Sequence, residues 1–205
     1  MYKPEPIDTS GVALDEYLVE LSEILAKNFH DRWARQLAAE GWQGNTARDG
    51  KQRPSRLGAL APTSMDEGRV AVCHAFGFAY KQHVSELLPY GVYTIPEVSC
   101  VGVTQEQAAE RAIRSVAGRA FYRDNPRGKI IGDREGLVKL IFDHETRRLL
   151  GCHCIGEHAT ELVHIGQSLI LLGGTVETLI EMVFNYPTLA ELYKYAAYDA
   201  LGHWN

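Results

Sequence analysis

The hydrophobic period of the chain changes near residue 97, and this change restricts the folds that the chain can adopt. Beyond that point apolar residues recur with a period of two, as in Val138, Leu140 and Phe142, which is typical of a strand with one buried face. Strands are expected at four places: 98–103, 114–123, 136–142 and 147–155. The turn at 143–146 joins the last two strands into a hairpin.

Three helices are expected after the last strand. The first covers 159–172, the second begins at Thr175, and the third begins at Thr188, which forms a T-x-x-E capping box with Glu191. Strands that follow one another and then give way to helices predict the α+β class, with an antiparallel sheet covered by helices.

The N-terminal part has a helical period instead. Residues 42–56 are polar, contain glycine and proline, and are expected to form a loop, which a second helix over 63–80 and an extended stretch over 87–96 follow. A helix over about 12–39 is predicted by one apolar stripe with spacings of three and four residues: Leu14, Leu18, Leu21, Leu25, Phe29 and Trp33. We therefore expect a helical N-terminal segment ahead of the sheet.

The charge and hydropathy of the chain exclude several classes of partner. With 21 basic and 26 acidic residues the net charge is −5, which argues against nucleic acid or an anionic membrane surface as the main partner. No apolar run approaches the ~18 residues of a membrane-spanning helix, and the N-terminus lacks the order of a signal peptide. We expect a cytoplasmic protein with reduced thiols.

The glycines form no phosphate-binding loop. Among the 19 glycines there is no G-x-G-x-x-G and no P-loop, the motifs that place backbone N–H groups around a diphosphate. We therefore expect that this chain alone binds neither FAD nor NAD(P).

Cysteine and histidine residues suggest a metal site at first sight, but their geometry argues against one. On a strand Cys152 and Cys154 share one face while His153 lies on the other, so the three cannot converge on one ion, and we expect no metal site. His158 and His164 are expected to have capping and surface roles. An anion patch or solvation of a hairpin edge would equally explain four basic residues: Arg127, Lys129, Arg147 and Arg148.

The segment from Asn185 to Glu191 is the strongest candidate site. A polar pair, Asn185 and Tyr186, precedes a proline and a helix start, where free N–H groups and the helix dipole favour an anion or an electron-rich ring. A tight corner between two helices is an equally good interpretation of this pattern.

Four segments of the chain carry a family resemblance: Leu60–Val70, Pro89–Val98, Leu150–Glu157 and Asn185–Thr188. On these motifs, residues 57–205 resemble the C-terminal part of the soluble transhydrogenases in the flavin-dependent pyridine nucleotide-disulfide oxidoreductase family. The resemblance implies that 57–88 is a remnant of the last helix of an FAD domain. It implies that 89–205 is a dimerisation domain of the FAD/NAD-linked reductase type, and hence that the chain forms a homodimer.

The resemblance also implies roles for individual residues. The disulfide reductases of the family carry a general-base His and a partner Glu, whose positions Tyr186 and Glu191 occupy here. Tyr has a reference pKa of about 10 and is a poor base at neutral pH, which points to the transhydrogenase branch, where hydride passes through flavin between NAD and NADP. Leu60 and Ala61 would face the flavin, and Asn185 and Tyr186 would line the flavin site of the neighbouring subunit.

Residues 25–54 resemble the first half of the RyR domain, on Leu25–Ala34, Glu40–Trp42 and Arg48–Asp49. We therefore expect residues 1–56 to form a helical RyR-like segment, and the resemblance implies binding of a ligand or partner. Trp33 and Trp42 could wall a ligand pocket, with a packed helical hairpin as the alternative.

The expected function is that of a dimerisation module of a transhydrogenase-like flavoprotein that lacks its own FAD and NAD sites and is inactive alone. A second possibility is a fragment or subunit of an active transhydrogenase, completed by another chain that carries the FAD and NAD domains. A third is a ligand- or partner-binding RyR-like module.

Overall fold

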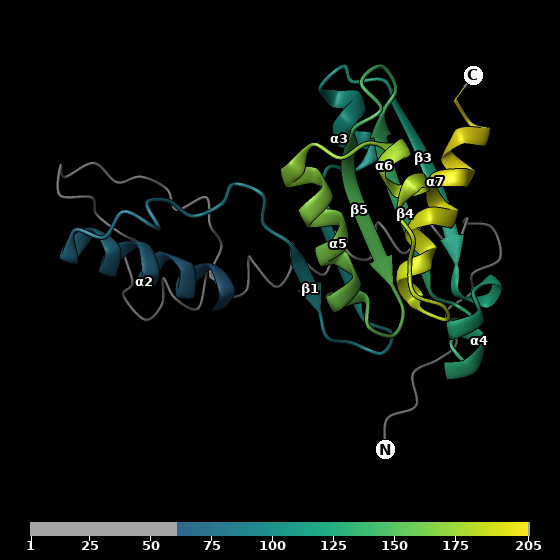
Figure 1. Ribbon diagram of the computed structural model, residues 1–205, viewed down its shortest axis with the longest axis horizontal. Coiled ribbons are helices and arrows are strands. Elements are labelled where there is room, and N and C mark those ends of the chain that lie inside the picture. Colours follow the sequence, from purple (N-terminus) through teal and green to yellow (C-terminus); the bar gives the residue numbers. More distant parts are fainter. Residues whose placement is uncertain (1–60, 205) are drawn as a thin grey trace. The chain divides into compact units, whose positions relative to one another are not determined.

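The computed structural model describes residues 61–204, which belong to two compact units divided between Glu86 and Leu87. In the first unit, helix α2 (Ala61–Phe76) is followed by a loop that returns along it (Figure 1). The helix ends four residues earlier than the sequence predicts, because Gly77 adopts a left-handed φ of 70°. The Phe78 N–H then donates to the Cys73 carbonyl over 2.8 Å and closes the helix end.

The second unit is built on one antiparallel sheet. Its strands are β1 (Tyr90–Val92), β2 (Val98–Gly102), β3 (Ser115–Phe121), β4 (Leu137–Asp143) and β5 (Leu149–Ile155). Their spatial order is β1-β2-β5-β4-β3, and every neighbouring pair is antiparallel. The expected α+β fold with an antiparallel sheet is thus confirmed for this unit.

The turn between β4 and β5 is fixed by one carboxylate. Oδ1 of Asp143 accepts the N–H groups of Glu145 and Thr146, both over 2.8 Å, and these bonds lower the pKa of the Asp143 carboxyl. Arg147 takes a positive φ of 62° at the end of the turn. The sequence predicts this hairpin correctly because Asp favours turns of this kind.

Three helices cover one face of the sheet: α5 (Ala159–Leu172), α6 (Val176–Glu181) and α7 (Leu192–Gly202) (Figure 1). Helix α5 packs on β5 and β2, and α7 packs on β3 and β4. The approach of α7 is close: a Cβ placed on Gly118 of β3 would lie 2.0 Å from the Ala196 carbonyl oxygen. The core between the sheet and these helices includes the predicted alternating residues of β4: Val138, Leu140 and Phe142.

Two short helices complete the second unit. The N-cap of helix α3 (Gln105–Glu110) is Thr104, as the sequence predicts. Thr104 forms a capping box with Gln107. Helix α4 (Pro126–Ile131) follows β3 after a 3₁₀ turn (η1, Tyr122–Asp124) and was not expected from the periodicity, because six residues are too few to show it.

The predicted helix at 12–39, the loop at 42–56 and Leu60 lie outside the described residues. The extended stretch at 87–96 contains only the three-residue edge strand β1. Among residues 61–204, no helix combines the length and apolar character that crossing a membrane requires.

Candidate functional site

The corner between α6 and α7 is the candidate site, and it runs from Met182 to Glu191. A 3₁₀ turn (η2, Leu189–Glu191) leads directly into α7. The peptide bond between Tyr186 and Pro187 is cis. Leu189 is buried and anchors the corner to the core of the second unit.

Three polar side chains fix the backbone of the corner. The Thr188 hydroxyl donates to the Asn185 carbonyl over 2.7 Å, and Oε2 of Glu191 accepts the Thr188 N–H over 3.4 Å. Nδ2 of Asn125 donates to the Thr188 carbonyl over 3.0 Å. Because the Asn125 side chain is itself buried and its Oδ1 caps α4 at Gly128 over 3.1 Å, the corner is tied to a second element.

On this fixed backbone the corner exposes large apolar and aromatic side chains. Val183 is 93% exposed and Tyr186 is 73% exposed, and Met182 and Asn185 are exposed beside them. Phe184 points the other way and packs against the core. The corner therefore presents a rigid, largely apolar surface to whatever lies opposite it.

The two residues of the predicted catalytic pair, Tyr186 and Glu191, have different surroundings at this corner. The Glu191 carboxylate accepts the Thr188 N–H in a capping box, so its role within the described residues is to cap the 3₁₀ turn η2 that leads into α7. The Tyr186 side chain is largely in solvent. Proton transfer by either residue stays a prediction, and the tight helix–helix corner accounts for the contacts that Glu191 makes.

The predicted flavin-facing residues lie in both units. Ala61 is the first residue of α2 in the first unit, whereas Asn185 and Tyr186 belong to the second unit. Leu60 is outside the described residues. That these four residues face a flavin stays a prediction.

The two cysteines of β5 lie in the core beside a buried tyrosine. The Tyr193 hydroxyl donates to the Leu162 carbonyl over 2.6 Å and accepts the Gly166 N–H over 3.2 Å. Since its proton is used, the Cys152 thiol, 3.1 Å away, donates to the same oxygen. Burial and the contact with the Cys152 thiol raise the pKa of Tyr193. The hydrogen bond between the Cys152 and Cys154 sulfur atoms, 3.7 Å apart, raises the pKa of the Cys154 thiol. The Cys154 thiol is therefore held neutral.

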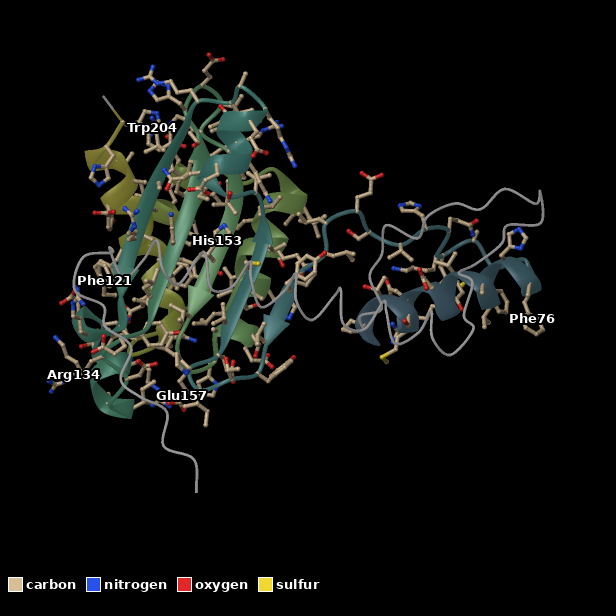
Figure 2. All side chains as sticks on the ribbon, turned by 180° about the vertical axis from the view of Figure 1, so that it is seen from behind. Phe76, Phe121, Arg134, His153, Glu157 and Trp204 are labelled. Carbon is tan, nitrogen blue, oxygen red and sulfur yellow. The ribbon has the colours of Figure 1, made fainter. Side chains whose placement is uncertain are left out.

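His153 lies on the opposite face of the sheet, as the alternation predicts (Figure 2). Its Nε2 is 3.2 Å from the Val103 carbonyl, and its cross-strand neighbours are Cys100 and Lys139. Burial lowers the pKa of His153 to about 4, so the ring is neutral at pH 7. Within the described range 61–204, no three His, Cys, Asp or Glu side chains converge in a way that could hold a metal ion.

The remaining basic residues and histidines do not gather into one site. Arg127 and Lys129 belong to α4, whereas Arg147 follows the β4–β5 turn, where it pairs with Glu177 and lies 4.4 Å from the centre of the Trp204 ring. His164 is exposed and bonds Gln167 of its own helix over 2.9 Å, which is the surface role expected for it. His158 stands at the start of α5 but makes no side-chain cap there.

The sequence interpretation missed the role of Asn125. A signal for it is present, because Asn125 precedes Pro126, and an N-cap residue followed by Pro at the first helical position marks a helix start. What the sequence cannot indicate is that the other end of the same amide reaches Thr188, 63 residues further along the chain.

Comparisons with known protein families give two matches. A family model described as "Pyridine nucleotide-disulphide oxidoreductase, dimerisation domain" matches residues 88–197, and one described as "RyR domain" matches residues 2–62. The first covers most of the second structural unit. The second falls almost wholly outside the described residues.

Similar proteins agree with the first of these matches. A soluble pyridine nucleotide transhydrogenase of Mycobacterium bovis (strain BCG / Pasteur 1173P2) is 49% identical over 143 residues, which cover 70% of this chain and 30% of that protein. The transhydrogenase of Escherichia coli (strain SMS-3-5 / SECEC) is 39% identical over 146 residues, covering 70% and 31%. The chain thus spans only about 30% of the length of these relatives.

Two solved structures have the same fold over a similar share of the chain. LpdA from Mycobacterium tuberculosis aligns with a TM-score of 0.63 and 26% identity, covering 70% of this chain and 31% of LpdA. RclA from Escherichia coli, an HOCl-induced flavoprotein disulfide reductase, aligns with a TM-score of 0.62 and 26% identity, covering 66% and 31%.

Proposed function

Because the chain belongs to the dimerisation-domain family of the pyridine nucleotide-disulphide oxidoreductases, we propose that it is the homodimerising module of a transhydrogenase-like flavoprotein. In this proposal the chain binds neither FAD nor NAD(P) by itself, has no activity alone, and works in the cytoplasm. The proposal draws on the lack of any G-x-G-x-x-G or P-loop sequence.

The observation that carries the proposal is the corner from Met182 to Glu191. Its backbone is fixed by Asn125, Thr188 and Glu191, yet it exposes Val183 and Tyr186. Apolar side chains held rigidly in water mark an interaction surface, because burying them against a partner costs little conformational entropy. In a homodimer the same surface of each copy would supply that contact.

A charge placed on the corner tests this contact. We expect Val183→Asp to weaken the dimer at least ~30-fold, since a carboxylate buried at a central apolar contact costs about 2 kcal/mol or more. Leu172→Asp, at an equally exposed apolar residue where α5 ends, is the matched control and should leave the dimer intact. Sedimentation velocity over micromolar concentrations gives the measurement. Equal effects of the two substitutions would contradict a dimer contact at the corner.

A second candidate function is that of a subunit completed in trans. The match to transhydrogenases covers 143 residues, too many to fit between residue 88 and the last residue, so it extends into α2 of the first unit. Retention of α2 outside the dimerisation domain favours a partner chain that carries the FAD and NAD domains. Tyr186 and Asn185 would then contribute shape to that partner's flavin site.

Reconstitution tests the second function. Mixing this chain with a chain carrying FAD and NAD domains should produce hydride exchange between NADPH and NAD that neither chain catalyses alone. If Tyr186 contributes shape and no proton, Tyr186→Phe should keep the rate within about twofold while Tyr186→Ala lowers it. Absence of exchange in the mixture would remove this candidate.

A third candidate function concerns the RyR-like segment, and the family match over residues 2–62 favours it. Here Trp33 and Trp42 would contact a ligand or partner. Their fluorescence should change on titration with a nucleotide panel in a Trp204→Phe background, and unchanged fluorescence would count against this role.

A further inference from the structure

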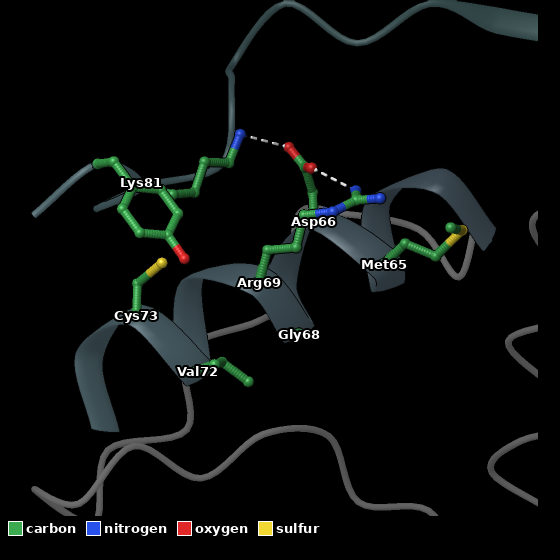
Figure 3. A pocket seen from close by; sticks show the side chains of 8 residues that line it. Met65, Asp66, Gly68, Arg69, Val72, Cys73 and Lys81 are labelled. Carbon is green, nitrogen blue, oxygen red and sulfur yellow. Dashed lines mark hydrogen bonds and ion pairs between the residues drawn. The ribbon is translucent and has the colours of Figure 1, made fainter. Parts of the chain in front are cut away.

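The first unit holds an open cavity of about 740 Å³ (Figure 3). One side of α2, from Met65 to Cys73, and the loop residues Tyr80 and Lys81 line it. Nζ of Lys81 donates to Oδ2 of Asp66 over 2.6 Å and ties the returning loop to the helix. The volume lies within the range of about 300–1,000 Å³ that is usual for small-molecule sites. The walls of the cavity are therefore formed in the chain itself, before any ligand binds.

Two cations are held side by side on the wall by one carboxylate (Figure 3). Oδ1 of Asp66 accepts from Nη1 of Arg69 over 3.0 Å, and Oδ2 accepts from Lys81. Both bonds, that from Lys81 first, lower the pKa of the Asp66 carboxyl, so the group is ionised at neutral pH. Because a guanidinium has five N–H donors and an ammonium has three, Arg69 and Lys81 each keep donors for a further acceptor.

The charge of the wall selects the kind of acceptor. The cations of Arg69 and Lys81 exceed the single negative charge of Asp66 by one unit. Tyr80 adds no negative charge, because its side-chain hydrogen bond with Cys73 raises the pKa of the Tyr80 phenol. A monoanion neutralises this wall, whereas a phosphate monoester, with a charge of about −1.5 to −2, exceeds it. Among monoanions a carboxylate matches the planar fork of the Arg69 guanidinium.

The rest of the lining favours an apolar body on the ligand. Met65 and Val72 lie seven residues apart on one face of α2 and are 59% and 50% exposed. Gly68 lies between them, and a Cβ placed there would meet nothing within 4 Å. The missing side chain leaves room along the helix, and the flexible Met65 side chain adapts to what fills that room. An apolar chain or ring that covers Met65 and Val72 removes apolar surface from water.

We propose that this cavity binds a small carboxylic acid with an apolar body. The carboxylate of the ligand accepts N–H groups of Arg69 and Lys81, and its body lies over Gly68 between Met65 and Val72. Asp66 acts as a positioning residue that holds the two cations together. All of these groups belong to one chain, so binding is independent of dimerisation and of any dinucleotide.

NMR of labelled methionine methyl groups in the intact chain tests the proposal, with octanoate as the probe. Octanoate should shift the Met65 signal to saturation and leave the signal of Met182, at the corner of the second unit, unchanged. Octanol has the same body without the charge and should bind at least ~10-fold more weakly, because it loses both charge-assisted contacts. Octyl phosphate should bind no more tightly than octanoate. An unshifted Met65 signal, equal affinity for octanol or tighter binding of octyl phosphate would overturn the proposal.

Filling the cavity tests where the apolar body lies. Gly68→Leu should weaken octanoate binding at least ~10-fold, because the new side chain occupies the room beside Met65 and Val72. Leu also favours a helix over Gly, so α2 should persist, and amide hydrogen exchange of α2 checks this. Gly202→Leu, at another open glycine of a helix, is the matched control and should leave binding unchanged. Binding to Gly68→Leu with the affinity of the parent would contradict the assignment.

Removing one cation tests where the carboxylate lies, whether or not the first variant folds. Arg69→Gln should weaken octanoate binding about 5-fold, the size of one partly exposed charge pair, and leave octanol binding unchanged. Arg134→Gln, at an exposed arginine of the second unit, should change neither affinity. The same effect of both substitutions on octanoate binding would overturn the role of Arg69.

Discussion

At the scale of single residues, buried polar side chains determine how the second unit is held together. Asn125 uses both ends of its amide, one for the α4 cap and one for the corner. Tyr193 uses its hydroxyl as donor and acceptor between α5 and α7. His153 is buried on the opposite face of the sheet as a neutral ring. Each of these polar side chains is buried and uses its hydrogen-bonding groups to hold parts of the fold together.

Substitution of Asn125 separates its two roles. Asn125→Ala leaves the Gly128 N–H and the Thr188 carbonyl without their partner, and we expect it to lower the free energy of unfolding by about 2–4 kcal/mol. Asn125→Ser keeps an N-cap oxygen and loses only the bond to Thr188, so it should cost about half as much. Urea denaturation measures both. A stability of Asn125→Ser equal to that of the parent would show that the bond to the corner contributes nothing.

Burial of His153 predicts a pH dependence of stability. Its folded pKa of about 4 lies below the ordinary value of 6.5, so the unfolded chain binds more protons between these values. The contribution of the neutral ring is complete above pH 6.5 and is lost as pH falls toward 4, by about 3 kcal/mol in total. Unfolding free energies of the parent and of His153→Gln, compared across this range, give the measurement. The same slope in both proteins would contradict the assignment to His153.

At the scale of elements, the sequence predicts the helices and strands whose hydrophobic pattern is continuous over enough residues to be recognised. Helix α5 has the predicted bounds because its apolar pattern is continuous and Gly173, with a φ of 69°, terminates it. Helix α4 escapes prediction because it is short, and β1 because it has only three residues, with Gly91 among them and Pro89 just before them. Of the candidate site, the corner and its capping box were predictable, whereas the Asn125 bond across 63 residues was not.

The close packing of α7 on β3 requires a glycine at position 118, because any side chain there would meet α7. We expect Gly118→Ala to destabilise the second unit by about 3 kcal/mol or more, because the new Cβ would meet the backbone oxygen of Ala196 at 2.0 Å, where a backbone shift is required. Gly202→Ala, on α7 itself, meets nothing within 4 Å and should be neutral or slightly stabilising. Thermal unfolding compares the two. A tolerated Gly118→Ala would show that α7 can move away from the sheet at little cost.

At the scale of the whole molecule, the fold places a rigid apolar corner on a unit of the dimerisation-domain family. The sequence predicted this architecture through periodicity and through resemblance, but how the surface is used depends on a second molecule that no single chain specifies. We therefore expect two copies to associate through their dimerisation domains, and neither copy to retain a dinucleotide of its own.

Native mass spectrometry of the purified 205-residue chain tests this expectation most directly, because one spectrum reports both the number of chains and the mass of any bound cofactor. At micromolar concentration we predict a species with twice the chain mass and no added mass of FAD or NAD(P). A monomer, or a dimer that carries one dinucleotide per chain, would contradict the account.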